Sequence, residues 1–359
     1  EAYLDKPPLI FWITSLFFKI IGVYDFIYRL PSIIFSLFSI YFTFQFSLLH
    51  YSKNTAMMAA LILASCEAFF IMNADVRTDI YMIAPMMAGV WYLSAYFKYN
   101  HLSDLIMGAI SVSFAMMGKG PIGLVIPITL IGVDLLLKKN IHLILDRRLI
   151  LGLAVILFFL LPMSYGLFTQ FGIYGLEFFY WTQSFGRITG ESSWSNETGI
   201  FYLLGVFLYA FLPWTLLFLW AFIERTRNIF NGNGFHNWSE TISYFGFIVP
   251  LIILSLSNYK LPHYIYCVVP FASILTAAKI EQWNKKYKII FNIQIGVSIF
   301  MLTIVYGIAI YAFPLGINFF IIPIVLIIGF IGVYLNYSKE ILTRLLILTT
   351  TVTILFNYG

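Results

Sequence analysis

The sequence predicts an all-α protein that crosses a membrane many times. Of its 359 residues, 61% are hydrophobic and only 10% are charged, whereas soluble domains carry about 25% charged residues. The apolar residues gather in runs of about 20, the length that spans a bilayer as a helix. Lys and Arg are concentrated in every second gap between these runs, as expected when alternate loops lie on opposite sides of a membrane.

These runs predict about twelve spanning helices, of which the fourth and ninth are short. They cover roughly residues 27–49, 55–73, 80–97, 102–117, 120–137, 149–168, 200–222, 241–257, 264–279, 289–312, 318–337 and 342–358. Residues 9–24 are also apolar but are flanked by charged residues, which favours a helix lying at the membrane interface. We therefore expect residues 1–26 to form an outer loop with an interfacial helix.

The distribution of basic residues supports this topology. When residues 1–26 are placed outside, 14 of the 21 Lys and Arg fall on the inner side, in agreement with the positive-inside rule. The seven outer ones are Lys6, Lys19, Arg29, Arg77, Lys119, Arg187 and Lys260. The net charge of +5 is thus explained by topology, and we expect no nucleic-acid partner.

A single membrane domain is expected over residues 1–359. The gaps between spans are short, except for a long outer loop over 169–199 that is rich in aromatic residues and glycine. Long loops are often functional. Cys66 and Cys267 lie in apolar runs without metal-type spacing, so we expect inert buried thiols.

The outer cations need an explanation because they oppose the general bias. Together they predict an outward-facing polar cavity that suits a lipid phosphate, since Lys and Arg bind phosphate oxygens. If a bond to that phosphate breaks, fixed cations stabilise the charge that grows on its oxygen. Lys6 and Arg187 are the first candidates, followed by Lys260. Lys119 has an equal alternative as a charge at a helix end.

The acidic residues and the histidine on the outer side are weighed in the same way. Asp75 and Asp79 are four residues apart and would share one face of a helix. Asp79 either binds a substrate hydroxyl or supports a general base, or it is a cap or dipole partner at the start of a span. His263 provides an imidazole on this side and, with Tyr264, is either part of the cavity or an ordinary interfacial residue.

Several familiar signatures do not occur in the sequence. It contains no phosphate-binding glycine loop of the nucleotide-hydrolase kind and no His-x-x-x-His metal pair. It also lacks the Gly-x-Ser-x-Gly turn of serine esterases. ATP hydrolysis by a known motif and serine esterase chemistry are therefore not expected.

Six motifs in order resemble the bacterial branch of the protein O-mannosyltransferase-like membrane glycosyltransferases, a branch that includes the lipid A aminoarabinose transferases. The motifs are Tyr3-Leu4-Asp5-Lys6-Pro7-Pro8-Leu9 with Arg29-Leu30-Pro31-Ser32, Thr78-Asp79, Lys119-Gly120-Pro121, Phe185-Gly186-Arg187, Leu212-Pro213-Trp214 and Lys260-Leu261-Pro262-His263-Tyr264. The resemblance extends over nearly the whole chain.

This resemblance implies a GT-C fold, a helical bundle with an outward active site. The donor would be a sugar on polyprenyl (undecaprenyl) phosphate, and the acceptor lipid A, another glycan or a protein hydroxyl. The implied reaction is an inverting displacement at the periplasmic face of the bacterial inner membrane. Lys6 matches the lysine that contacts the lipid phosphate, and Arg187 and Tyr264 match residues that line the same region.

The resemblance also assigns the remaining site residues. Asp79 matches a second acidic position with a supporting role, and Asp5 matches a position that helps bind zinc in the aminoarabinose branch. No cofactor is clearly required, although a divalent metal is possible. The family's first span and its catalytic aspartate would lie upstream of Glu1. We therefore expect a fragment, inactive alone, that also lacks a C-terminal periplasmic domain.

Two other functional classes remain as alternatives. A transporter or flippase of an anionic polyprenyl lipid would spread its charges through the spans and pair half-helices near the midplane. A non-catalytic membrane scaffold would leave the outer cations unexplained. The sequence favours the transferase because its charges gather at the outer ends of the spans.

Overall fold

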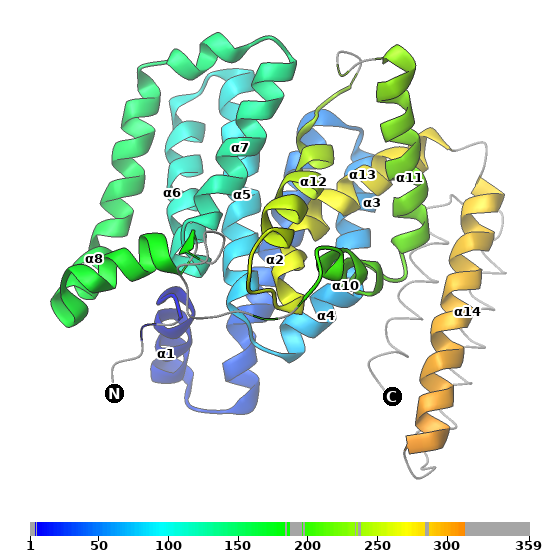
Figure 1. The fold of residues 1–359 in the computed structure, drawn as a ribbon, viewed down its shortest axis with the longest axis horizontal. Helices are drawn as coiled ribbons and strands as arrows, with labels where there is room; N and C mark the ends of the chain where they lie inside the picture. The colour runs from blue at the N-terminus through cyan, green and yellow to red at the C-terminus, as the bar shows by residue number, and fades with distance from the viewer. Residues whose placement is uncertain are drawn as a thin grey trace.

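The computed structural model describes residues 4, 6–183, 185–186, 196, 198–233, 235, 238–283 and 287–312. These residues form helices joined by short turns, and no strand occurs among them. In chain order the helices are α1 (Leu9–Ile21), α2 (Asp25–His50), α3 (Lys53–Ala64), α4 (Glu67–Ala74), α5 (Thr78–Tyr99), α6 (Leu102–Lys119), α7 (Ile122–Leu137), η1 (Ile141–Leu145), α8 (Arg148–Glu177), η2 (Phe178–Thr182), α10 (Tyr202–Ala210), α11 (Thr215–Asn228), η3 (Ile229–Asn233), α12 (Ile242–Ser255), η5 (Pro262–Val268), α13 (Val269–Gln282) and α14 (Tyr287–Ala312). The predicted all-α class is confirmed for this part of the chain. In Figure 1 the bundle extends from α8 at one edge to α14 at the other.

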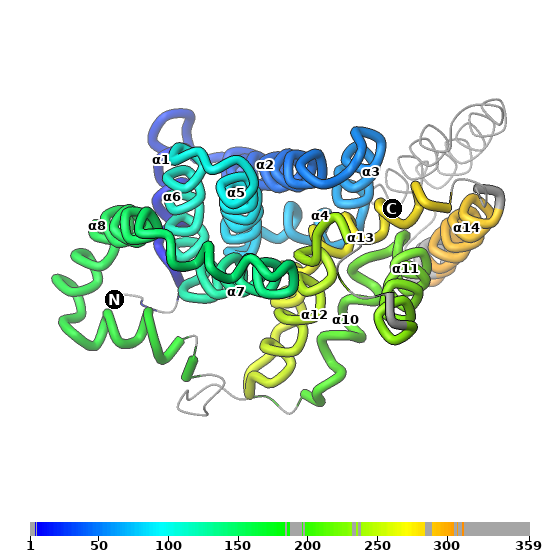
Figure 2. The backbone as a smooth tube through the Cα atoms, turned by 90° about the horizontal axis from the view of Figure 1, so that it is seen from above, coloured from blue at the N-terminus to red at the C-terminus, as the bar shows by residue number. Residues whose placement is uncertain are grey.

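Helix α5 lies at the centre of this bundle. It packs against α2, α6, α7 and η5, and Figure 2 shows it enclosed by its neighbours when the bundle is seen from above. Every residue from Asp79 to Val90 is buried. A helix that is buried on all faces is expected in the middle of a bundle. Its first turn therefore carries the Asp79 side chain into the protein interior.

The predicted number of spans is not confirmed. Five helical segments are long and apolar enough to cross a membrane among the described residues: α2, α5, α6, α8 with η2, and η5 with α13. Helices α3 and α4 form a sixth span if the pair, bent by 49°, is taken together. The spans expected over 120–137 and 241–257 are the shorter helices α7 and α12. Those expected over 318–337 and 342–358 lie outside the described residues.

Two of the expected spans are broken, and their breaks meet. The span expected over 55–73 divides between α3 and α4, and the span expected over 200–222 divides between α10 and α11. The Glu67 backbone N–H donates to the Leu212 carbonyl over 3.0 Å, and the indole Nε1–H of Trp214 donates to the Ser65 hydroxyl over 2.9 Å. Each break thus supplies partners for polar groups of the other, which is how irregular backbone is tolerated in the interior of a membrane protein.

The prediction of a loop over residues 169–199 is wrong for the first part of that range. Helix α8 continues to Glu177, and the helical turns of η2 extend to Thr182. Gly172 has φ 64° and ψ −152° at a kink within α8, a backbone conformation that favours glycine. The helix turns there, and Figure 2 shows its second part at the edge of the bundle. The aromatic residues that suggested a loop therefore lie partly on a helix that runs back toward α1.

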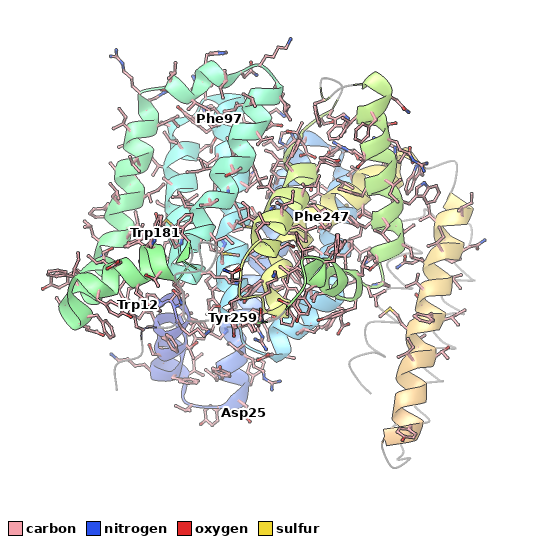
Figure 3. All side chains as sticks on the ribbon, viewed as in Figure 1. Trp12, Asp25, Phe97, Trp181, Phe247 and Tyr259 are labelled. Carbon is pink, nitrogen blue, oxygen red and sulfur yellow. The ribbon has the colours of Figure 1, made fainter. Side chains whose placement is uncertain are left out.

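Helix α1 follows the two prolines, where the sequence predicted an interfacial helix. It has 13 residues, and the side chains of Trp12, Leu16 and Ile20 are 46%, 53% and 72% exposed. Its place at a membrane interface stays a prediction. Figure 3 shows Trp12, Trp181 and Tyr259 on the side of the bundle toward Asp25, with Phe97 near the opposite end.

Candidate functional site

Asp79 is the centre of a polar cluster at the start of α5. Its side chain is 1% exposed, and Oδ1 accepts a hydrogen bond from the Lys119 ammonium. Its other oxygen, Oδ2, faces His263 Nε2 at 3.7 Å and has no hydrogen-bond partner among the described residues. Asp79 also lies in the first turn of α5, where the helix dipole favours a negative charge. Arg77 is the N-cap residue of α5 and makes no capping hydrogen bond with its side chain, so Asp79 is a partner of the helix dipole and of the cluster but not the cap.

Lys119 reaches Asp79 because α6 approaches α5 very closely. A Cβ atom added to Gly118 would lie 2.6 Å from the Tyr81 carbonyl oxygen, so only glycine permits this contact. Gly120, at φ 85°, then ends α6. Lys119 is therefore the last residue of its helix, where a cation also stabilises the helix dipole. Its Nζ lies 4.3 Å from the centroid of the Tyr264 ring.

His263 joins this cluster to a second ion pair. Its Nδ1 lies 3.0 Å from Nη1 of Arg77, and the Arg77 guanidinium also bonds the Asp75 carboxylate. The sequence did not assign Arg77 to the site. Asp75 and Asp79 do not share a helix face, because Asp75 follows the last residue of α4 and α5 begins only at Thr78. That expectation is wrong, since the chain turns between the two aspartates.

A cavity of about 120 Å³ opens beside the cluster. Two cationic side chains line it, Lys6 from the segment before α1 and Lys119 from α6. The other lining residues are Pro7, Thr78, Ile122, Val125, Gln183, Phe185, Ile253, Leu254, Ser257, His263 and Tyr264. The structure thus places four of the predicted site residues, Lys6, Lys119, His263 and Tyr264, around one space, and Asp79 binds the Lys119 ammonium beside it.

Lys260 takes a different place. Its side chain is buried, and its Nζ donates to the Thr198 carbonyl over 3.1 Å. Its backbone is held by the Asn196 amide, which accepts from the Lys260 N–H over 3.0 Å and donates to its carbonyl over 2.6 Å. Lys260 does not line the cavity. In this geometry it fixes the segment before η5, which carries His263 and Tyr264.

Two predicted residues, Asp5 and Arg187, lie outside the described residues. Their roles stay predictions. Within the described part of the chain, no three His, Cys, Asp or Glu side chains come together as metal ligands. The zinc role of Asp5 therefore has no described partner residues. Both cysteines are free and buried, as predicted.

Sequence reasoning missed three cavity or cluster residues. Gln183 and Ser257 line the cavity, and Arg77 orients His263. Arg77 was detectable as an outer cation between two aspartates. Gln183 and Ser257 carry no pattern that separates them from other polar residues near helix ends.

Known proteins resemble this chain in sequence. Residues 5–165 match the family model described as dolichyl-phosphate-mannose-protein mannosyltransferase. An undecaprenyl phosphate-alpha-4-amino-4-deoxy-L-arabinose arabinosyl transferase from Wigglesworthia glossinidia brevipalpis is 27% identical over 302 residues, covering 80% of this chain and 50% of that protein. An uncharacterized Aquifex aeolicus protein is 26% identical over 312 residues, covering 86% of this chain and 66% of its own length.

A solved structure shows the same fold. The crystal structure of ArnT from Cupriavidus metallidurans bound to undecaprenyl phosphate superposes with a TM-score of 0.82 at 18% identity, covering 99% of this chain and 66% of that one. The chain thus shares the fold of ArnT and is similar in sequence to curated arabinosyl transferases. It is a multi-pass membrane protein. The chain spans between half and two thirds of the length of the curated relatives described above.

Proposed function

We propose that this chain forms the donor-binding part of a membrane glycosyltransferase. The enzyme takes a sugar from a polyprenyl phosphate, with undecaprenyl phosphate as the carrier, and transfers it to a hydroxyl of lipid A, another glycan or a protein. The observation that carries the proposal is the cavity lined by Lys6, Lys119 and Tyr264 beside the buried carboxylate of Asp79. The relatives' names and the GT-C fold point to the same chemistry.

The cations suit the leaving group of such a transfer. In an inverting displacement the acceptor oxygen attacks the anomeric carbon, and the bond from that carbon to the phosphate oxygen breaks on the opposite side. The phosphate keeps the electron pair, so negative charge grows on its oxygens. Fixed cations in a partly buried site stabilise this charge in the transition state. Lys6 lines the cavity from one side and Lys119 from another, and Arg187 is proposed as the third cation.

Asp79 has a supporting part in this scheme. One of its oxygens binds the Lys119 ammonium, and the other faces His263. A carboxylate held in this way keeps the Lys119 ammonium beside the Tyr264 ring, and it is poorly placed to take a proton from an acceptor. The proton acceptor is proposed to be the aspartate that the family carries before the Asp5-Lys6 motif. Asp75 is assigned as the residue that holds Arg77. Lys260 is assigned as the residue that holds the His263–Tyr264 segment.

The walls of the cavity suit a lipid-linked donor. Ile122, Val125, Ile253 and Leu254 line it together with Phe185. Apolar walls beside cationic groups match a polyprenyl chain that ends in a phosphate, because the chain needs no polar partners. We place this end of the bundle at the periplasmic face of the inner membrane. The proposal includes zinc binding through Asp5, and the zinc requirement of the transfer reaction is to be measured.

The proposal is tested by measuring sugar transfer from undecaprenyl-phosphate sugar. The assay uses membranes that contain the full-length gene product. Lys6→Ala and Arg187→Ala should each lower the rate at least tenfold, which corresponds to about 1.4 kcal/mol of barrier. Lys19→Ala is the matched control, because Lys19 is exposed at the end of α1 and does not line the cavity. Normal rates in both variants, at equal protein levels, would contradict the phosphate assignment.

A transporter or flippase of an anionic polyprenyl lipid is the second candidate. It is favoured by one observation, the meeting of the α3–α4 and α10–α11 breaks, since paired broken helices occur in transporters. Here, however, the fully buried Trp214 fills the junction, and the cationic cluster lies at the start of α5. Proteoliposomes that move labelled undecaprenyl phosphate across the bilayer without transferring sugar would favour the transporter.

A further inference from the structure

Arg77, His263 and Asp79 are in successive contact beside the cavity, which His263 lines. The Arg77 guanidinium contacts His263 Nδ1 at 3.0 Å, and His263 Nε2 faces Asp79 Oδ2 at 3.7 Å. Arg77 is itself held by Asp75. His263 is only 13% exposed, so its ring has little freedom to turn away from these partners.

The contact with Arg77 determines which ring nitrogen carries the proton. A guanidinium has only N–H donors and stays charged in proteins, so the atom facing it has to accept. Nδ1 of His263 therefore presents its lone pair to Arg77. A neutral imidazole carries one proton, which then resides on Nε2. Protonation of Nδ1 would place two N–H donors against each other.

The Nε2–H group points toward the oxygen that lacks a partner. Asp79 Oδ2 is buried and accepts no hydrogen bond among the described residues. At 3.7 Å the Nε2–Oδ2 separation is longer than a hydrogen bond, and a shift of less than 1 Å would close it. Catalytic hydrogen bonds are often long without substrate and shorten in the reacting complex.

We propose that Arg77 is a positioning residue that holds His263 as the neutral tautomer protonated at Nε2. His263 then supplies an N–H to Asp79 without adding charge to the cavity. The effect on catalysis rests on the proposed glycosyl transfer, whereas the tautomer itself does not. The benefit concerns Lys119. An imidazolium at position 263 would compete for the Asp79 carboxylate and weaken the hold on the Lys119 ammonium.

The charges around His263 favour the same state. Asp79 faces it from α5, Lys119 from α6, Arg77 from the turn before α5 and Lys6 from the segment before α1. Burial of the ring disfavours a positive charge on it first, and the three cations among these four groups add to that effect against the opposing attraction of Asp79. We therefore expect His263 to stay neutral through the pH range in which an ordinary histidine titrates, about pH 5 to 8.

Nitrogen-15 NMR of the histidine-labelled full chain in nanodiscs tests the tautomer directly. His263→Gln assigns the signals. The wild-type protein should show the neutral Nε2–H form of His263 unchanged from about pH 5 to 8. Arg77→Met should let His263 exchange tautomers and titrate, whereas Arg29→Met, an exposed arginine outside the cavity, should leave its signals unchanged. A wild-type Nδ1–H form or imidazolium at pH 7, or no effect of Arg77→Met, would overturn the proposal.

Sugar transfer then tests the role of the tautomer. The amide nitrogen of His263→Gln can occupy the place of Nε2, whereas that of His263→Asn occupies the place of Nδ1. Gln should keep the rate within about threefold and Asn should lower it at least about tenfold. Arg77→Met should make the rate pH-dependent where the wild type is flat. Equal losses for Gln and Asn would overturn the positioning role. A locked tautomer in a protein without transferase activity would instead contradict the proposed function alone.

Discussion

Substitution of Gly118 by alanine tests the close approach that builds the site. An added Cβ would lie 2.6 Å from the carbonyl oxygen of Tyr81, 2.7 Å from its carbonyl carbon and 2.8 Å from the Met82 nitrogen. All three atoms belong to the backbone of α5, so no flexible side chain can move aside. Ordinary contact requires about 3.4 Å. Helix α6 therefore has to move away from α5 by somewhat less than 1 Å.

The expected cost follows from this displacement. Overpacking of a dense interior typically costs about 1–3 kcal/mol, and we expect Gly118→Ala to lower the free energy of unfolding by that amount. Lys119 moves with Gly118, so its contact with Asp79 is stretched as well. Misplacement of a catalytic group by about 1 Å can lower a rate about 100-fold. Gly118→Ala should therefore impair transfer more than it impairs stability.

Thermal unfolding in detergent and sugar transfer measure the two effects separately. Gly132→Ala in α7 is the matched control, because a Cβ added there meets nothing within 4 Å. Alanine is the better helix former by about 1 kcal/mol, so this control should be neutral or slightly stabilising. The reasoning about helix approach would be refuted if the two alanine variants had the same stability and the same rate.

Three further predictions concern packing and charge. Trp214→Phe removes the buried hydrogen bond between the two helix breaks and should cost about 1–3 kcal/mol of unfolding free energy; the exposed Trp12→Phe should cost little, and equal effects would contradict the account of the breaks. Lys119→Met leaves Asp79 as an unpaired buried charge and should cost about 3–5 kcal/mol, whereas Lys119→Met with Asp79→Asn should recover much of the loss; no recovery in a double-mutant cycle would refute the pairing. The side chain of Arg148, and then that of Tyr96, hydrogen-bonds Asp146 and lowers the pKa of its carboxyl, so this carboxylate should stabilise the protein above its ordinary pKa of about 4. That contribution is lost as the pH falls, and an acid unfolding profile that Asp146→Asn leaves unchanged would contradict it.

The helical class was predictable because long apolar runs with basic gaps have few other interpretations. The breaks in these runs were not. The residues from 55 to 73 are mostly apolar on both sides of the bend at Ser65, and the partner that completes the break, Trp214, lies 149 residues away in the sequence. Local sequence therefore shows where a helix can form, but not where another element allows it to stop.

The set of residues in the candidate site was largely predictable from the sequence, but the contacts between them were not. Topology placed Lys6, Asp79, Lys119 and His263 on one side, and the structure brings them together. Topology could not distinguish Lys260 from the cations that line the cavity, although the Lys260 ammonium donates a hydrogen bond to the Thr198 carbonyl instead. Such choices depend on short contacts between distant segments, and charge patterns do not encode them.

The most direct measurement is a structure of the protein with undecaprenyl phosphate bound, determined in nanodiscs. The account predicts the phosphate in the cavity between Lys6, Lys119 and Tyr264, with the first isoprene units against Ile253 and Leu254. A phosphate bound at the opposite end of α5, near Lys98, with this cavity empty of lipid, would contradict the central claim.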